Sequence, residues 1–230
     1  MRLKRSAAFD GKEIMLKVWF IRHGQSQANA GQKTSDSSGI ELSPLGRKQA
    51  ELVADHFSKA PDLIVSSPYL RARQTSECLA SQFPQVPVET WPVQEFTYLA
   101  HERCENTTET ERVPLAHEYW ERYDPHYVDG EAVESYAGFM ARVEETWTRL
   151  MSDHRNKRVV VFSHAHFIKA SIWYWLHPKD RLTPKGMRRY RNFLYSVPIP
   201  NGAILKASYG DEFSFGVPLI DHIPEDLRGN

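Results

Sequence analysis

The stretch KVWFIRHGQS, residues 17–26, decides the fold. Residues 18–21 form a short apolar run, and the polar turn Arg22-His23-Gly24 follows it directly. Short apolar runs that end in such turns are typical of buried strands, commonly in parallel sheets. Two later stretches repeat the pattern, DLIVSS at 62–67 and RVVVFS at 158–163, and each becomes polar at its C-terminal end. We therefore predict three buried strands whose ends carry polar side chains.

Helical patterns alternate with these strands. Ser43-Pro44 is a good N-cap and first-turn pair for a helix that runs to about Phe57. Further helices are predicted after Pro68, from about 135 to 150, and from 163 to about 177. Late strands at 203–207 and 213–220 are expected to form an antiparallel hairpin across Gly210 at a sheet edge. This alternation predicts an α/β fold, three-layer α/β/α, with a mostly parallel central sheet.

The chain length of 230 residues favours one domain with an insert. We predict an N-terminal extension at 1–14 and a single domain at 15–230. Residues 97–130 fit neither the helical nor the strand period, and we interpret them as a helical insert over the sheet, acting as a lid. Its Tyr119, Trp120, Tyr123 and Tyr127 fit either a core of the insert or groups that stack on substrate.

The overall composition excludes some classes of protein. Lys plus Arg equals Asp plus Glu at 29 each, which argues against a nucleic-acid-binding protein. Cys78 and Cys104 have no metal-ligand or disulfide spacing and are expected to be free thiols. No apolar run reaches bilayer length, and residues 1–14 lack the apolar stretch of a signal peptide. We expect a cytoplasmic protein with no membrane partner, and the oligomeric state stays open.

Charged and polar groups follow all three predicted buried strands. In open α/β sheets, ligands bind outside the carboxyl ends of the strands. Arg22 and His23, then Arg71 after Ser67, and finally His164 are therefore expected to converge on one crevice. The planar fork of arginine suits a tetrahedral oxyanion, and Gly24 would let the backbone approach that anion closely. Guanidinium charge also keeps a nearby histidine neutral and nucleophilic.

These residues lie in motifs that resemble those of the histidine phosphatase superfamily, also called phosphoglycerate mutase-like. The signature VWFIRHGQS is followed, in the family's order, by five further segments. They are LSPLG at 42–46 with Gln49-Ala50, SSPYLRARQT at 66–75, Glu134-Ser135 with Arg142, and VVFSH at 160–164 with a late PNGAI at 200–204. The resemblance covers about residues 17–207 and implies the phosphoglycerate mutase-like fold.

The resemblance implies a role for each matching residue. His23 is the nucleophile, and Arg22, Arg71 and His164 form the phosphate pocket. Gly24, Asn29 and Ala165 are implied further phosphate contacts, and Glu95 occupies the place of the general acid. The implied reaction is a double displacement through a phosphohistidine on a small phosphorylated metabolite, without metal or cofactor. Glu102, Glu105 and Glu109 follow closely, however, and a solvated acidic face would also explain any single one of these carboxylates.

Two alternatives to a phosphomonoesterase stay open. A phosphoglycerate mutase-type phosphotransferase shares the motifs, but Phe96-Thr97-Tyr98 after Glu95 departs from the arginine-tyrosine-glycine pattern of true mutases. A non-catalytic phospho-ligand-binding protein is disfavoured because the chemical groups of the site are all retained, namely His23, Arg71, Glu95 and His164. The pair His164 and His166 matches no standard zinc spacing, so no metal site is predicted.

Overall fold

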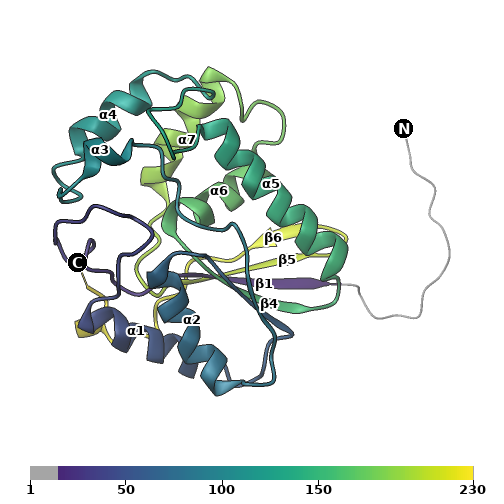
Figure 1. The fold of residues 1–230 in the computed structure, drawn as a ribbon. Coiled ribbons are helices and arrows are strands. Elements are labelled where there is room, and N and C mark those ends of the chain that lie inside the picture. Colours follow the sequence, from purple (N-terminus) through teal and green to yellow (C-terminus); the bar gives the residue numbers. More distant parts are fainter. Residues whose placement is uncertain (1–14, 230) are drawn as a thin grey trace, which may run out of the picture.

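A sheet of six strands forms the centre of the fold in the computed structural model, which describes residues 15–229 (Figure 1). The strand order is β3-β2-β4-β1-β5-β6. The strands are β1 (Leu16–Arg22), β2 (Leu63–Ser66), β3 (Val88–Thr90), β4 (Arg158–Ser163), β5 (Ile204–Tyr209) and β6 (Phe213–Phe215). Strands β1 to β4 run parallel to one another, and β5 is antiparallel to both β1 and β6. The mostly parallel sheet and the edge hairpin are confirmed, although β6 ends at Phe215; the extension predicted for residues 1–14 lies outside the described residues.

Helices cover both faces of the sheet and give three layers, as predicted. Helices α1 (Pro44–Asp55) and α2 (Leu70–Gln82) lie on one face, and α5 (Tyr136–Asp153) and α6 (Ala165–Leu176) on the other (Figure 1). Successive side chains of a strand point to opposite faces. On β4, Val160 and Phe162 join the core beneath α1 and α2, while Val159 and Val161 join the core beneath α5 and α6. Burial on both faces explains the uninterrupted apolar run.

The segment 97–130 contains two short helices, α3 (His101–Cys104) and α4 (Val113–Glu121), linked by turns. It lies with α7 (Pro184–Ser196), far from α1 and α2 (Figure 1). Its two ends are joined by a hydrogen bond of 2.9 Å, which the Ala100 N–H donates to Asp129 Oδ2. Tyr119 and Trp120 are 1% and 3% exposed and belong to the core of the α5 and α6 face. These two aromatics are therefore packing groups of the insert.

Helices α1, α5 and α7 begin with the same local motif, a hydroxyl residue at the N-cap and a glycine three residues later. The N-cap oxygens of Ser43, Ser135 and Thr183 accept the glycine N–H at 3.0, 3.1 and 3.0 Å. Such a bond satisfies one of the four N–H groups that lack a partner within the first turn of a helix. The caps thus fix where these three helices begin.

The capping glycine of α1 also permits a close backbone contact. A Cβ atom at Gly46 would lie 1.9 Å from the Gln25 carbonyl oxygen, and a Cβ at Gly24 would lie 2.3 Å from the Gly46 carbonyl oxygen. Neither distance is possible for a real side chain, so α1 packs backbone to backbone against the turn that follows β1. This contact fixes the position of the turn that carries His23.

We expect Gly46→Ala to lower the free energy of unfolding by about 1–3 kcal/mol, because the added methyl group must push α1 away from the turn. Gly138→Ala is the matched control. Gly138 occupies the same cap position in α5, but a Cβ there would lie 3.5 Å from its nearest neighbour, Ser135 Oγ. Urea denaturation measures both variants. Equal effects of the two substitutions would contradict the close contact of α1.

Candidate active site

His23 lies at the carboxyl end of β1 and is 3% exposed. Its Nδ1 lies 2.7 Å from the Gly24 carbonyl oxygen. A carbonyl oxygen only accepts, so Nδ1 carries the proton and the lone pair is on Nε2. Arg71 Nε donates to this Nε2 at 3.1 Å. The backbone N–H of His23 donates to the Ser163 carbonyl at 3.0 Å, so both ring and backbone are held in place.

Two arginines flank His23. Arg71 lies in the first turn of α2, is 6% exposed, and donates from Nη1 to the Ser37 carbonyl at 2.6 Å. Arg22 is the last residue of β1 and donates from Nη1 to the Ile199 carbonyl at 2.7 Å, while its buried Nε has no partner among the described residues. Burial lowers the pKa of Arg71 to about 10, and the charge of Glu95 opposes this shift. Both guanidinium groups thus stay charged at neutral pH.

His164 completes this group from the carboxyl end of β4. Its ring centroid lies 4.9 Å from that of His23, and the residue is fully buried. Ser67, which follows β2, is the hydrogen-bond partner of His164 Nε2 at 2.9 Å. The ends of β1, β2 and β4, which are neighbours in the sheet, therefore bring His23, Arg71 and His164 together. The three residues thus lie together at the strand ends, as predicted, with His23 and Arg71 in the cavity lining and His164 fully buried beside them.

Burial and positive charge act together on the two histidines. Burial is the largest influence on His23, and the charges of Arg71 and Arg22 add to it, so that its pKa lies well below its ordinary value. Burial and the charge of Arg71 likewise hold the pKa of His164 well below its usual range. Both rings are therefore neutral near pH 7, and the lone pair of His23 Nε2 is available as a nucleophile.

Glu95 lies in the loop after β3, and its side chain contacts the N-terminus of α6. Its carboxylate accepts the backbone N–H of His166 at 3.0 Å and that of Phe96 at 3.1 Å. The segment that leads to Glu95 is held from α5, because Arg142 Nη1 donates to the carbonyls of Pro92 at 2.7 Å and Gln94 at 3.1 Å. A carboxylate fixed in this way lies at the rim of the same cavity that exposes His23.

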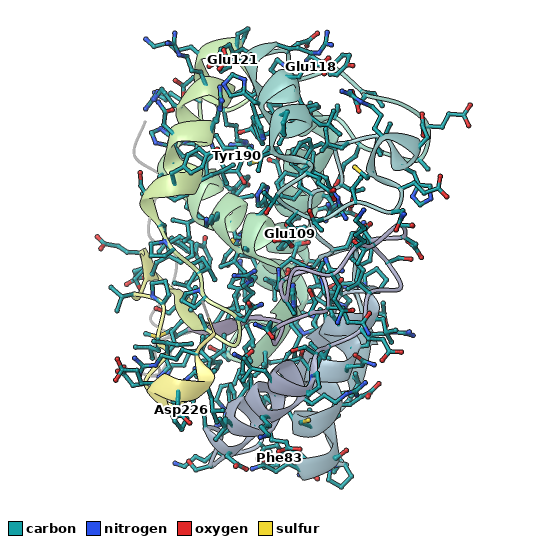
Figure 2. The ribbon with its side chains drawn as sticks, turned by 90° about the vertical axis from the view of Figure 1, so that its left-hand side faces the viewer. Phe83, Glu109, Glu118, Glu121, Tyr190 and Asp226 are labelled. Atoms are coloured by element: carbon teal, nitrogen blue, oxygen red, sulfur yellow. The ribbon has the colours of Figure 1, made fainter. Side chains whose placement is uncertain are left out.

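The cavity above His23 has a volume of about 640 Å³. Its floor is formed by strand ends, one wall by the loop of residues 24–40, and its roof by the insert. Loop and insert are joined by an isolated bridge between Thr34 and Thr107, where Arg112 Nη2 donates to Thr34 Oγ1 and the Thr107 carbonyl, each at 2.6 Å. A second link joins Asn29 Nδ2 to Glu109 Oε1 at 3.0 Å, and Figure 2 shows Glu109 between the insert and the loop. The cavity is thereby covered from above.

The predicted site residues divide into three groups. Those in the cavity lining are Arg22, His23, Asn29, Arg71, Glu95 and Ala165. His164 lies directly beneath, against His23. Gly24 is not in the lining, and its N–H donates a hydrogen bond of 3.1 Å to Thr75 Oγ1. The reason for a glycine here is the contact with α1 described above, and the geometry argues against the predicted contact of Gly24 with phosphate.

Some lining residues had no role in the sequence-based prediction. Tyr69 packs its ring 5.1 Å from the Arg71 guanidinium and 5.3 Å from the His164 ring. Lys169 lies four residues after Ala165 on α6, so helical periodicity would have placed it on the cavity side. Among the competing acids, Glu109 lines the cavity, whereas Glu102 and Glu105 do not. Glu109 is thus the acid against which Glu95 has to be tested.

Two further features concern metals and membranes. Within residues 15–229, no three or more His, Cys, Asp and Glu side chains are grouped so that they could hold a metal ion. No helix in the same range has the length and apolar character needed to cross a membrane.

Comparison with known proteins identifies related sequences and folds. The model of the histidine phosphatase superfamily (branch 1) matches residues 18–196. The 5''-phosphoribostamycin phosphatase of Niallia circulans is 25% identical over 177 residues, which cover 70% of this chain and 78% of that protein. The alpha-ribazole phosphatase of Shigella flexneri has a TM-score of 0.67 at 20% identity, with 88% of this chain and 95% of that chain covered. The phosphoserine phosphatase of Entamoeba histolytica in complex with 3-phosphoglyceric acid has a TM-score of 0.65 at 24% identity. The match covers 90% of this chain and 99% of that chain. The two structures share the fold of this chain.

The lowered histidine pKa values predict a pH-dependent stability. Below about pH 6.5, His23 and His164 bind protons in the unfolded chain but not in the folded protein. The free energy of unfolding therefore decreases as the pH is lowered toward the folded pKa values. Each such proton contributes about 1.4 kcal/mol per pH unit. We expect His23→Asn to reduce the slope of the free energy of unfolding against pH by about 1.4 kcal/mol per pH unit, the contribution of one proton. The exposed His117→Asn is the control. Urea denaturation between pH 4.5 and 7.5 measures the slopes, and an unchanged slope in His23→Asn would show that His23 titrates normally in the folded protein.

Proposed function

This chain belongs to the histidine phosphatase superfamily (branch 1), and on that premise we propose that it is a metal-independent phosphomonoesterase acting on a small phosphorylated metabolite. The proposed intermediate is a phosphohistidine on His23. The observation that supports this most is the state of that ring. Gly24 holds the proton on Nδ1, so the lone pair of Nε2 lies in the cavity between Arg22 and Arg71.

In the first step, the phosphate group of the substrate replaces His23 as the acceptor for Arg71. Arg71 and Arg22, whose buried Nε has no partner among residues 15–229, bind the phosphate oxygens. His23 Nε2 then attacks phosphorus in line, the bond from phosphorus to the ester oxygen breaks, and Glu95 gives its proton to the departing oxygen. For His164, whose ring centroid lies 4.9 Å from that of His23, we propose that it turns from Ser67 to donate to the phosphoryl group as its charge develops.

In the second step, water attacks the phosphohistidine from the side that the leaving group has left. Glu95, now a carboxylate, accepts a proton from this water, and the bond between phosphorus and Nε2 breaks. Inorganic phosphate departs, and His23 is again neutral with its lone pair on Nε2. Because the two arginines supply the positive charge that stabilises the transferring group, the proposed mechanism needs no metal ion.

The cavity supports a small-molecule substrate. Its volume of about 640 Å³ is in the range of sites for metabolites, and the insert covers it from above. The related proteins carry the names of phosphatases for phosphoribostamycin, alpha-ribazole and phosphoserine, which are phosphate esters of very different size. We propose that residues 97–130 act as a lid and select among such esters, because the phosphate pocket contacts only the shared group.

We also propose that the protein acts in the cytoplasm. Cys78 and Cys104 are both free thiols in the structure, and thiols persist in a reducing compartment.

His23→Ala tests the proposed function directly. We expect the variant to lose at least about a thousandfold in turnover of p-nitrophenyl phosphate while it remains folded, because no other group takes over the attack. The assay contains EDTA, and the exposed His117→Ala serves as the control. Near-normal turnover by folded His23→Ala would overturn the proposal, as would a wild type that is inactive in EDTA and recovers with one divalent metal.

Glu95→Gln tests the general acid. Glutamine can still accept the His166 N–H but has no proton to give to a leaving group. We expect a loss of about a hundredfold or more for an alkyl phosphate and a much smaller loss for p-nitrophenyl phosphate, whose phenolate leaves without protonation. Glu109→Gln is the matched variant within the same cavity. If Glu109→Gln shows this dependence on the leaving group and Glu95→Gln does not, the acid is Glu109.

A further inference from the structure

Glu95 lies in a stretch, residues 92–97, that forms neither helix nor strand. A general acid has to come within about 3 Å of the atom that it protonates, so its support has to be well fixed. Backbone groups of an irregular stretch find their partners in other elements, because they have none in a helix or sheet of their own. The position of Glu95 therefore depends on the side chains that hold residues 92–97.

Arg142 of α5 holds the part of this stretch that precedes Glu95. Its Nη1 donates to the carbonyls of Pro92 at 2.7 Å and Gln94 at 3.1 Å. The side chain is 10% exposed, and its guanidinium group lies 5.1 Å from the centre of the Phe139 ring. A charged group that is nearly buried needs a counter-charge, which hydrogen bonds to carbonyl oxygens do not supply. A carboxylate is therefore needed close to Arg142.

Glu134 supplies this carboxylate and also holds the part of the stretch that follows Glu95. Arg142 donates from Nε to Glu134 Oε2 at 3.1 Å and from Nη2 to Oε1, which is the forked geometry of a strong pair between arginine and carboxylate. The backbone N–H of Glu134 donates to the Thr97 carbonyl at 3.1 Å. The two residues of the pair thus hold the stretch on both sides of Glu95.

Neither Arg142 nor Glu134 is among the residues that line the cavity, whereas Glu95 is. The pair is thus in no position to bind substrate, and any effect on the reaction has to pass through another residue. Ser163 Oγ donates to the Val93 carbonyl at 2.6 Å and attaches the same stretch to β4 independently of the pair. Loss of the pair should therefore loosen Glu95 without detaching the stretch from the sheet.

We propose that Arg142 and Glu134 are positioning residues that place the Glu95 carboxyl group at the leaving group. This inference rests on the proposed function, in which Glu95 protonates the departing oxygen. A pair that only stabilised the fold would make a different prediction, since its removal would lower the turnover of all phosphate esters equally. Removal of a positioning pair would lower turnover most for the esters whose leaving groups most need a proton.

The test compares phenyl phosphate with p-nitrophenyl phosphate, two esters of similar size whose leaving groups differ in basicity. We expect Arg142→Met to lower kcat about tenfold or more for phenyl phosphate and less than about threefold for p-nitrophenyl phosphate, because a displaced acid matters most where the leaving oxygen needs a proton. KM should change little for both esters, since Arg22 and Arg71 still bind the phosphate group. Glu134→Gln, which keeps the backbone bond to Thr97, should show a smaller loss of the same kind, and it carries the test if Arg142→Met does not fold.

A double variant separates an action through Glu95 from an action on the fold. In Glu95→Gln there is no proton to position, so the addition of Arg142→Met should change the ratio of the two kcat values less than about twofold. Arg149→Met is the matched control, because Arg149 lies on the same helix, pairs with Glu89 at 2.6 Å and packs 4.0 Å from the centre of the Trp91 ring. We expect the control to keep the wild-type ratio.

Equal losses for the two esters in a folded variant of the pair would overturn this inference alone and leave a pair that stabilises the fold. A ratio that changes as much in the Glu95→Gln background as in wild type would also overturn it, because Arg142 would then act through another group. That group would be His164, whose pKa burial lowers, with a small contribution from the charge of Arg142. Absence of p-nitrophenyl phosphate hydrolysis in wild type would instead overturn the proposed function, and this inference with it.

Discussion

The hydrogen bond of 3.1 Å from Arg71 Nε to His23 Nε2 is the interaction on which the rest of the site depends. It exists only because the ring is neutral with its lone pair on Nε2, and that state requires the Gly24 carbonyl on Nδ1 and the burial of the ring. A charged guanidinium group facing a neutral imidazole leaves an unused positive charge in the cavity. A phosphate dianion would complete this arrangement, since it accepts from the arginine and exposes the nucleophile to phosphorus in one movement.

Contacts with backbone groups hold this arrangement in position. The turn after β1 is fixed by the close approach of α1, which two glycines allow, and by the bond from the His23 N–H to β4. Arg71 is anchored through Ser37 in the loop of residues 24–40, and that loop is in turn joined to the insert at Thr34 and Thr107. The insert is thus connected to Arg71 through this loop.

Much of the fold could be predicted because β1, β2 and β4 are buried on both faces and leave apolar runs in the sequence. Strand β3 was missed, since it has three residues and its Val88 is 51% exposed at the sheet edge. The convergence of His23, Arg71 and His164 followed from parallel strands ending together. The role of Gly24 did not, because a glycine that admits a helix and one that admits a phosphate look alike in sequence.

The central claim is that His23 Nε2 carries the phosphoryl group during turnover, and trapping that intermediate tests it most directly. Wild-type protein is mixed with a phosphate ester, quenched in alkali within milliseconds, digested and analysed by mass spectrometry. The structure predicts a phosphate that is stable in base, labile in acid, and located on Nε2 in the peptide that contains His23, because Nδ1 is held by the Gly24 carbonyl. Rapid turnover with phosphate on another residue, or with phosphate on Nδ1 of His23, would contradict this account.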